Sequence, residues 1–345
     1  MSAKARRAWF SISSIIYKDK RISVERAFQL FDSLVSPVAL YGCEVWYPAI
    51  LPKKSFQGTY SLLYSWENFQ SEKLNQSCAR ILLSVHRKAS RLAVLGDLGR
   101  HPMAVRAIAH CLNYRLCLAS KPGNSLLGRV MTEMTDMTQT GADCWLSRAN
   151  KMAQLLDTPD VRFCQTSGRH MLRCVKSKFE RYWMDEIKSS RLGIDGQQHN
   201  KLLTYSSFKS SFNIQPFIML VRNRNQRCQL SRLRVSAHRL GCELQPQIPR
   251  DERFCKYCPP TNGPGGQTVR PVDNECHCLT DCIVSRAERT VLFDNISSRN
   301  SDFSVLCNVD KFKTLVCPIS SIDCKEVNRY LALHFKERDN IDLGV

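Results

Sequence analysis

The chain has 345 residues, of which 43% are hydrophobic, so it is long and apolar enough to fold around a core, which excludes a disordered tail. It carries 50 Lys and Arg against 31 Asp and Glu, and the formal net charge of +19 predicts a polyanionic partner, most commonly nucleic acid. The 17 cysteines follow no repeating framework and many stand in apolar runs, which argues against a secreted disulfide scaffold and for a reducing compartment.

The chain shows no sign of a membrane or export signal. No apolar run approaches the ~20 residues of a membrane span, and the first residues lack the apolar segment and cleavage site of a signal peptide. We therefore expect an intracellular protein, in the nucleus or the cytoplasm, with no membrane partner.

The first part of the chain predicts helices separated by loops. Residues 3–16 indicate a helix with a basic beginning, and Ser23 is placed to cap a second helix over VERAFQLFDSLV. Pro37 is expected to break that helix, after which PVALYGCEVWYP resumes as an apolar segment. Residues 48–65, with their prolines, glycine and serines, predict a loop, and a further helix is expected over about 66–85.

The middle of the chain predicts three more helices, at residues 103–119, 125–134 and 144–156. They follow LAVLGDLGRHP, whose glycines mark turns and match neither a P-loop nor a dinucleotide-binding motif. We interpret Asp97 in this turn as a helix cap and not as a catalytic acid.

Residues 169–188 predict a helix with one basic and one apolar face. A basic face of this kind suits a helix that lies across a phosphate backbone, although a solvated surface helix would show the same pattern. The candidate phosphate contacts are Arg169, Arg173 and Lys176.

A second basic concentration, residues 215–244, follows a polar stretch at 191–214 that we take as a boundary between domains. Its six arginines are expected to lie in one helical stretch, and a basic helix that leads into a cysteine-rich segment is typical of a nucleic-acid module. These candidate phosphate contacts are Arg222, Arg224, Arg227, Arg232, Arg234 and Arg239.

The segment RFCKYCPPTNGPGGQTVRPVDNECHCLTDC has the spacing of a metal site. Cys255 and Cys258 form a C-x2-C pair, and His277 and Cys282 follow as H-x4-C, so the two pairs could close a tetrahedron around Zn²⁺. The loop between the pairs cannot form a core of its own, so a bound ion is expected to tie its ends together.

Three further residues leave the ligand set open. Cys276 and Cys278 flank His277 and could replace it or Cys282, and His238 is a fifth candidate that we interpret instead as a surface or core histidine. The alternative for the whole cluster is ordinary buried thiols beside a surface loop. Four ligand types in one short window, with metal spacing at both ends, favour the metal site.

After Cys282 the sequence predicts amphipathic helices at residues 285–296 and 325–335, and FSVLC and FKTLVC between them are interpreted as helical turns. No alternating run of strand length occurs. The predicted fold is therefore mainly α: a multi-helix bundle and linker, followed by a small zinc-knuckle module in a helical carboxy-terminal region.

No catalytic set can be assembled from the sequence. It lacks Y-x-D-D or other paired carboxylates for two-metal phosphoryl transfer, as well as G-x-S-x-G and H-E-x-x-H. A zinc site with four protein ligands has no open position and indicates a structural role. We therefore expect a protein that is not an enzyme and has no small-molecule substrate.

Two segments are similar to non-LTR (LINE-type) retrotransposon reverse transcriptases. Residues 30–46, LFDSLVSPVALYGCEVW, resemble the pattern L-F-D-S-L-V-x-P-x-x-L-Y-G-x-E-V-W that follows the polymerase palm. The stretch from SRLRVSAHRLGCEL onward resembles the carboxy-terminal patterns R-x-x-x-H-x-L, R-x-C-x-x-C and E-x-H-x-L-x-x-C. The matching residues are Arg234, His238, Leu240, Arg253, Cys255, Cys258, Glu275, His277, Leu279 and Cys282.

The resemblance implies a carboxy-terminal fragment of such a polyprotein, without the palm aspartates and the endonuclease domain that relatives carry upstream. It implies a thumb-like helical segment over 1–60, a helical linker domain over 61–214, and a region over 215–345 with the basic helix, a CCHC zinc knuckle and terminal helices. The eighteen residues between Cys258 and His277 exceed the family's usual loop, which fits either a longer loop or a decaying copy.

We therefore expect a non-catalytic remnant of a reverse transcriptase that binds Zn²⁺ and nucleic acid, RNA in preference to DNA. Phe254 and Tyr257 are candidates for sequence-tolerant stacking on bases. Two alternatives stay open: a zinc-stapled helical interaction or scaffold protein, and a degenerate mobile-element reading frame without activity.

Overall fold

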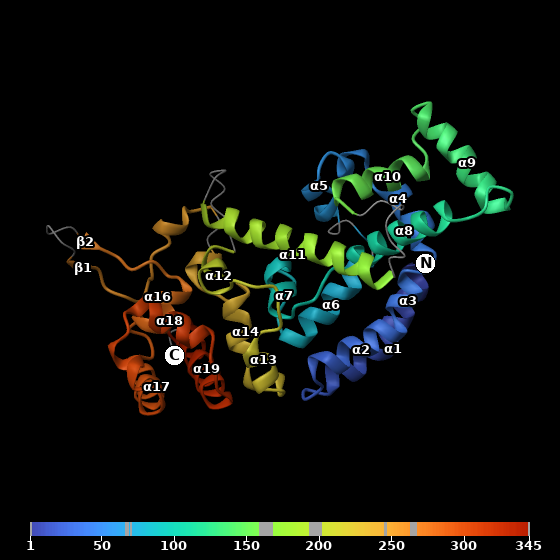
Figure 1. Cartoon of the computed structure of the whole chain (residues 1–345). Coiled ribbons are helices and arrows are strands. Elements are labelled where there is room, and N and C mark those ends of the chain that lie inside the picture. The colour runs from blue at the N-terminus through green and yellow to red at the C-terminus, as the bar shows by residue number, and fades with distance from the viewer. Residues whose placement is uncertain are drawn as a thin grey trace. The chain divides into compact units, whose positions relative to one another are not determined.

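The computed structural model describes residues 2–65, 69, 71–158, 168–192, 202–244, 247–262 and 268–343. Nineteen α-helices lie in these residues, together with short 3₁₀ helices and one two-stranded hairpin, so the predicted mainly α fold is confirmed (Figure 1). The chain forms two compact units that are interleaved along the sequence. Unit 1 comprises residues 1–14, 28–78 and 101–184, and unit 2 comprises residues 15–27, 79–100 and 185–345.

Four helices contribute residues to both units: α1 (Ser2–Lys18), α2 (Val24–Leu34), α6 (Glu72–Leu83) and α11 (Gly168–Leu192). The other helices of unit 1 are α3 (Ser36–Ala39), α4 (Cys43–Ile50), η1 (Lys53–Phe56), α5 (Thr59–Tyr64), α8 (Met103–Ala119), α9 (Leu126–Gln139) and α10 (Trp145–Leu155). Unit 2 adds α7 (Arg91–Asp97), α12 (Leu203–Phe208), α13 (Pro216–Leu220), η4 (Arg224–Gln226), α14 (Cys228–Arg234), α15 (Gly241–Leu244), η5 (Arg250–Glu252), β1 (Thr261–Asn262), β2 (Thr268–Val269), α16 (Glu275–Thr280), α17 (Arg286–Arg299), η6 (Ser301–Val305), α18 (Asn308–Val316) and α19 (Ser321–Leu343).

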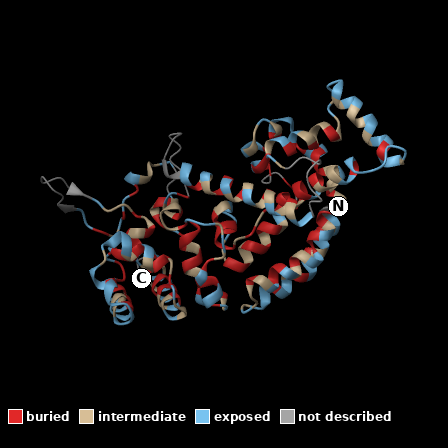
Figure 2. Cartoon of the chain, in the orientation of Figure 1, coloured by how far each residue is buried: buried red, intermediate tan, exposed pale blue. Residues whose placement is uncertain are grey.

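Unit 1 is built around α8, most of whose residues are buried and which packs against α4 and α10. Pro102 precedes α8 and offers no side-chain cap. The buried Glu72 supplies one instead, because its carboxylate accepts a hydrogen bond from the Met103 amide at 2.7 Å. Figure 2 shows the contrast between the largely buried α6 and the mostly exposed α9.

Two boundaries predicted in the amino-terminal part are wrong. Residues 48–65, predicted as a loop, contain the end of α4 together with η1 and α5, because Leu62 and Leu63 are buried and hold this segment on the core. The helix expected over 66–85 is α6, which begins at Glu72, while residues 66–68 and 70 lie outside the described residues.

In unit 2, α19 packs against α14, α17 and α18, and α16 packs against α18. The interior of this group of helices is filled by apolar side chains such as Leu230, Leu315 and Leu331. The turns predicted over FSVLC and FKTLVC are η6 and α18, which confirms their helical character. No helix in the described ranges is both long and apolar enough to cross a membrane.

The single helical stretch predicted over 215–244 is wrong. The chain runs through α13, η4, α14 and α15 with breaks between them, and Ser236 adopts a left-handed φ of 54° after α14. The polar stretch at 191–214 contains α12, and its residues 193–201 lie outside the described part of the chain. The division into segments 1–60, 61–214 and 215–345 stays a prediction.

Candidate metal centre

Four predicted ligands come together in unit 2. Cys255 and Cys258 lie between η5 and β1, His277 lies on α16, and Cys282 follows the end of that helix. All four residues are buried, and their ligand atoms all lie within 4.8 Å of one another. The cluster could therefore hold a metal ion.

The sulfur atoms stand at the separation expected of ligands to one ion. Cys282 Sγ lies 4.0 Å from Cys255 Sγ and 3.9 Å from Cys258 Sγ, and Cys258 Sγ lies 3.3 Å from His277 Nε2. With metal–sulfur bonds of about 2.3 Å and tetrahedral angles, two sulfurs on one zinc ion are roughly 3.8 Å apart. A disulfide would instead bring two sulfurs to about 2.05 Å. The distances fit coordination and exclude a disulfide within the cluster.

Local hydrogen bonds explain why the H-x4-C spacing works. Asn274 caps α16 by accepting a hydrogen bond from the His277 amide at 2.9 Å, and the Cys282 amide donates to the His277 carbonyl at 2.9 Å. This last bond turns the chain at the end of α16, so that His277 and Cys282 enter the same cluster. The Ile283 amide donates to Cys258 Sγ at 3.4 Å, but burial outweighs this bond and raises the pKa of the Cys258 thiol.

The proton distribution within the cluster favours a thiolate at Cys282. The pKa of Cys282 is held far below its ordinary value, first by a hydrogen bond from the Cys255 thiol and then by His277, His334 and Arg338. That same hydrogen bond is the main reason why the pKa of Cys255 is raised. These hydrogen bonds favour the thiolate form of Cys282, which is the form in which cysteine binds metals.

The long loop between the two ligand pairs is closed by backbone pairing. Its strands β1 and β2 form an antiparallel hairpin, labelled in Figure 1, and Phe254 pairs with Val272 nearer the ligands. The Cys255 amide also donates to the Pro271 carbonyl at 2.8 Å. This ladder brings the loop ends together by backbone hydrogen bonds, and the expected contribution of a bound ion to the same tie stays a prediction.

The other ligand candidates stay outside the cluster. Cys278 is fully buried and Cys276 half-buried on α16, but the group of four ligand atoms includes neither of them. Cys276 lies instead beside the Thr280 hydroxyl, 3.9 Å from it. The four residues that the spacing favoured are the ones that the structure gathers into a cluster able to hold a metal ion.

His238 belongs to a second buried group, with Cys242 and Glu275, whose ligand atoms also lie within 4.8 Å of one another. Arg250 donates to both carboxylate oxygens of Glu275, at 3.3 and 3.0 Å, and Thr204 donates to one of them at 2.8 Å. His238 Nδ1 accepts from the Leu240 amide, so its Nε2–H is left to donate to Glu275 at 3.1 Å. With a guanidinium already on the carboxylate, this group is an ion-pair network. Of the two positions expected for His238, surface or core, the structure shows the core.

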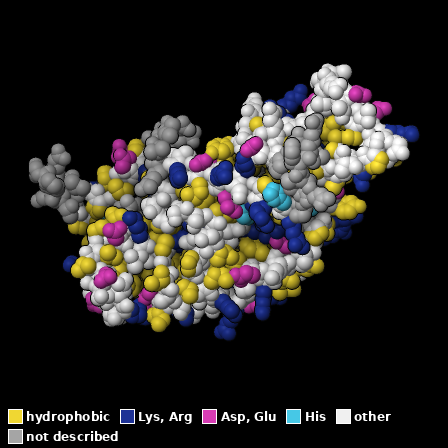
Figure 3. All heavy atoms as spheres, in the orientation of Figure 1, with side chains coloured by type: hydrophobic (Ala, Val, Ile, Leu, Met, Phe, Trp, Pro, Cys, Tyr) yellow, Lys and Arg dark blue, Asp and Glu magenta, His cyan; other side chains and the backbone are white. Residues whose placement is uncertain are grey.

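The basic helix predicted over 169–188 is α11. Arg169 and Arg173 are exposed and Lys176 is half-buried, whereas Phe179 and Trp183 are buried. Figure 3 shows Lys and Arg side chains, with a few acidic ones among them, along this helix. The amphipathic arrangement is confirmed, and phosphate contact by these residues stays a prediction.

Three of the six arginines predicted to contact phosphates between 222 and 239 are interior residues, and their assignment is wrong. Arg224, Arg227 and Arg234 are each 1% exposed. Arg224 donates to the carbonyls of Ile16 and Ile81, and Arg227 donates to that of Leu82, at 2.7, 2.8 and 3.0 Å. These carbonyls lie in the last turns of α1 and α6, which lack intrahelical partners, so the guanidinium groups cap helix ends.

Arg234 forms a buried ion pair. Its Nη2 and Nε donate to the two carboxylate oxygens of Asp97, both at 2.8 Å, and Tyr205 donates to the same carboxylate at 3.0 Å. Burial by itself lowers the pKa of Arg234, but Asp97 outweighs it and raises this pKa above its ordinary value. Asp97 is therefore a counter-ion and not the helix cap predicted from the sequence.

The other three arginines of that set differ among themselves. Arg232 is half-buried and donates to the Ser84 carbonyl at 3.0 Å. Arg222 is exposed, and so is Arg239, which faces Asp339 at 3.5 Å. Only these last two keep the exposure that a phosphate contact requires.

The two stacking candidates also differ. Phe254 is 45% exposed, but Tyr257 is half-buried, with its hydroxyl on Asp342 at 2.9 Å and the guanidinium of Arg338 over its ring at 4.8 Å. Sequence reasoning missed these partners on α19. The signal was present as Y-x3-H-x3-R-x3-D, which places Tyr330, His334, Arg338 and Asp342 near one face of a helix.

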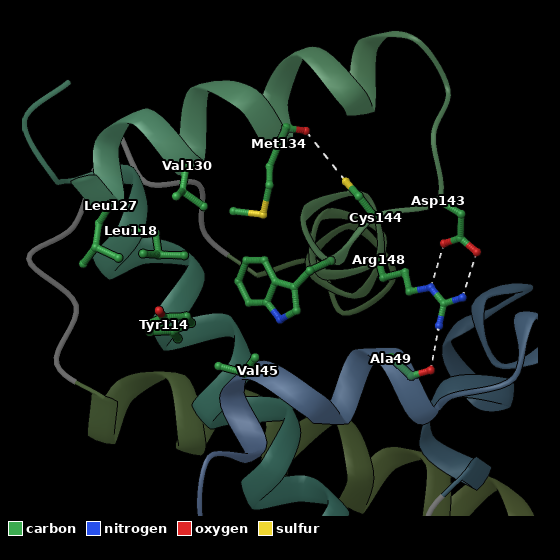
Figure 4. A pocket seen from close by; sticks show the side chains of 11 residues that line it. Val45, Ala49, Tyr114, Leu118, Leu127, Val130, Met134, Asp143, Cys144 and Arg148 are labelled. Atoms are coloured by element: carbon green, nitrogen blue, oxygen red, sulfur yellow. Dashed lines mark hydrogen bonds and ion pairs between the residues drawn. The ribbon is translucent and has the colours of Figure 1, made fainter. Parts of the chain in front are cut away.

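Unit 1 contains an apolar pocket of about 430 Å³ lined by α4, α8, α9 and α10 (Figure 4). Tyr114, Met134 and Trp145 contribute to its walls. Arg148 at the rim is held by Asp143 at 2.6 Å and donates to the Pro48 carbonyl at 3.0 Å. Its charge therefore closes the end of α4 and does not face the pocket unpaired.

The pocket also borders the Cys144 thiol, which lies at the start of α10. Burial raises the pKa of Cys144, but hydrogen bonds with Thr138 and Ser147 outweigh it, so the pKa is lowered. No motif in the sequence predicted this pocket, because its walls come from four separate helices.

Comparison with known proteins gave no match among family models, curated proteins or solved structures. The likeness of residues 30–46 and of the cysteine segment to LINE-type reverse transcriptases therefore stays a prediction. What the geometry provides is a buried cluster of three cysteines and one histidine that could hold a metal ion.

Proposed function

We propose that this chain is a non-catalytic remnant of a LINE-type reverse transcriptase that binds one Zn²⁺ ion and nucleic acid. The observation that carries the proposal is the buried cluster of Cys255, Cys258, His277 and Cys282. The family and the absence of catalysis rest on the sequence resemblance and on the lack of a catalytic motif.

Zinc is the ion that this donor set supports best. Three thiolates and one imidazole in tetrahedral reach are typical of structural zinc, and four protein ligands leave no position for substrate or water. Zinc here has a structural role: it links the loop before β1 to α16 and the residue that follows it.

Nucleic-acid binding is supported by the net charge of +19 and by the exposed basic side chains of α11. Arg169 and Arg173 are the main candidates for phosphate contacts, with Lys176 beside them and with Arg222 and Arg239 as further exposed arginines. RNA is favoured over DNA because the resemblance to LINE-type reverse transcriptases implies that this carboxy-terminal segment helps to bind RNA. An intracellular location follows from the same function.

The first experiment is zinc stoichiometry by native mass spectrometry, with and without chelator. We expect one zinc per wild-type chain, loss of that zinc in Cys255→Ser, and retention in the matched control Cys276→Ser, whose sulfur lies outside the cluster. Equal zinc content in wild type and Cys255→Ser would refute the ligand assignment. No zinc in the wild type would favour a degenerate reading frame without activity.

The second experiment tests the nucleic-acid function. Fluorescence anisotropy with a single-stranded RNA and a DNA of the same sequence, at about 50 to 200 mM salt, is expected to give a logarithm of affinity that falls linearly with the logarithm of salt concentration. We expect tighter binding of the RNA.

A zinc-stapled scaffold is the second candidate function. It is favoured by the interior position of Arg224, Arg227 and Arg234, which removes half of the second predicted basic set from the surface. RNA binding that is absent, or independent of salt, together with one bound zinc would support the scaffold.

A further inference from the structure

The metal cluster is covered by one face of α19, the last helix of the chain. Four residues of this face are spaced by four: Tyr330, His334, Arg338 and Asp342. Residues at this spacing lie one above another along a helix. Tyr330, His334 and Arg338 are buried. Tyr330, Arg338 and Asp342 contact the segment that holds the metal ligands.

Arg338 makes the most direct contact with the ligands. Its Nη2 lies 3.3 Å from Cys282 Sγ and 3.6 Å from Cys255 Sγ, so one nitrogen donates toward two of the three sulfurs. The same guanidinium pairs with Asp273 at 2.8 and 3.0 Å. Asp273 in turn accepts from the Gly241 amide at 2.6 Å, which fixes the pair from the other side.

His334 is the second buried polar residue on this face of α19. It is 0% exposed, and neither of its ring nitrogens has a hydrogen-bond partner. An imidazole buried without partners is costly unless something satisfies it. His334 stands one helical turn before Arg338, whose guanidinium contacts the sulfurs of Cys282 and Cys255.

The ends of this face anchor it to the same segment. Tyr330 donates its hydroxyl to the Cys278 carbonyl at 2.9 Å. Asp342 accepts from Lys256 at 2.5 Å and from Tyr257 at 2.9 Å, and these are the two residues inside the C-x2-C pair. Contacts therefore extend over three turns of α19.

We infer that α19 belongs to the metal centre, so that metal binding and docking of this helix are coupled. Arg338 and His334 are the positioning residues for the thiolates. The inference rests on the proposed zinc function and adds a third element to the site. A zinc ion with three thiolates and a neutral imidazole carries a formal charge of −1. Arg338 stabilises that charge through donated hydrogen bonds, and His334 gains a thiolate to which it can donate.

Coupling of this kind is reciprocal. Whatever factor the contacts of α19 add to zinc affinity, zinc must add to the docking of α19. Side chains that hold metal ligands in place typically change metal affinity by about 10- to 100-fold when replaced. Loss of the metal is thus expected to loosen a helix that begins nearly forty residues after the last ligand.

The test has two arms, and the first uses only the wild-type chain. Hydrogen exchange of α19 is measured with zinc bound and after chelation, with α8 of unit 1 as internal reference. We expect faster exchange in α19 without zinc and no change in α8. Unchanged exchange of α19, in a chain that loses its zinc, would overturn the coupling.

The second arm measures zinc affinity by competition with a chromogenic chelator. We expect Arg338→Met to weaken binding by about 10- to 100-fold and His334→Phe to weaken it less, with Arg338→Lys between Arg338→Met and wild type because the charge is kept. Arg329→Met is the matched control, since Arg329 is exposed on the same helix, and its affinity should match wild type.

Cobalt substitution separates positioning from a general loss of fold. In Co²⁺-loaded protein, Arg338→Met should shift the sulfur-to-metal charge-transfer bands while the number of bound thiolates stays at three. Wild-type affinity and unshifted bands in Arg338→Met would overturn the inference and leave the zinc function intact. A wild-type chain that binds neither metal would overturn both.

Discussion

Two stretches of this chain look alike in sequence and differ in structure. Both α11 and residues 222–239 interleave arginines with apolar side chains. In α11, Arg169 and Arg173 are exposed, whereas Arg224 and Arg234 in the second stretch are buried. A similar density of arginines in the sequence therefore does not imply that the arginines are equally exposed.

The difference follows from the acceptors around each stretch. α11 is one continuous helix, so its basic side chains extend from a backbone that is satisfied by its own hydrogen bonds. The second stretch is broken and lies against the carboxy-terminal ends of α1 and α6, whose last carbonyls have no intrahelical partners. A guanidinium offers five donors and can close several of these carbonyls at once. An arginine buried beside a helix end thus stabilises the fold by pairing with carbonyl groups, and its donors are not free for a ligand.

The largest effect is expected when the buried ion pair of Arg234 and Asp97 is removed. Arg234→Met leaves Asp97 buried without its counter-ion, and we expect the free energy of unfolding to fall by about 3–5 kcal/mol, measured by urea denaturation. Arg222→Met, at an exposed position of the same stretch, should change it by no more than about 0.5 kcal/mol. Equal effects of the two substitutions would mean that the interior position of Arg234 is wrong.

The pH dependence of stability tests whether Lys209 is a buried basic residue, in contrast to the exposed basic residues of α11. Burial lowers the pKa of Lys209 from 10.5 to about 8. The unfolded chain therefore binds more protons than the folded one between these values, so this group destabilises the fold below pH 8 and the penalty is relieved as the pH rises toward 10.5.

Relative to Lys209→Met, the wild type should gain about 3 kcal/mol of unfolding free energy between pH 8 and 10.5, measured by denaturation at each pH. Lys188→Met, at an exposed position of α11, serves as the control and should run parallel to wild type. A constant difference between wild type and Lys209→Met would contradict the shifted pKa.

The smallest effect on stability is expected for the exposed arginines of α11. Arg169→Gln with Arg173→Gln should leave the urea midpoint unchanged, weaken RNA binding, and reduce the slope of log affinity against log salt by about 1.4, the value for two phosphate contacts on a single strand. The matched control, Lys121→Gln with Arg129→Gln, removes two exposed charges from the region of α9. The same change of slope in both double variants would mean that RNA responds to surface charge in general and does not contact α11 in particular.

The predictable features of the molecule are those encoded at short range. The candidate ligand set Cys255, Cys258, His277 and Cys282 follows from a tight C-x2-C turn and from an H-x4-C spacing across the end of one short helix, and the structure brings these four side chains together. The amphipathic α11 and the helical class also follow from local periodicity. Such patterns need no knowledge of distant segments.

Local sequence patterns therefore account for the helical class, the four candidate metal ligands and the faces of single helices. Only the tertiary structure decided that Arg234 is paired with Asp97, that a hairpin closes the long loop, and that Arg338 reaches the sulfurs of Cys255 and Cys282. The physical reason is that periodicity reports which side chains share a face. The partner of a buried charge, by contrast, depends on which helix ends and carboxylates distant parts of the chain bring within hydrogen-bond reach.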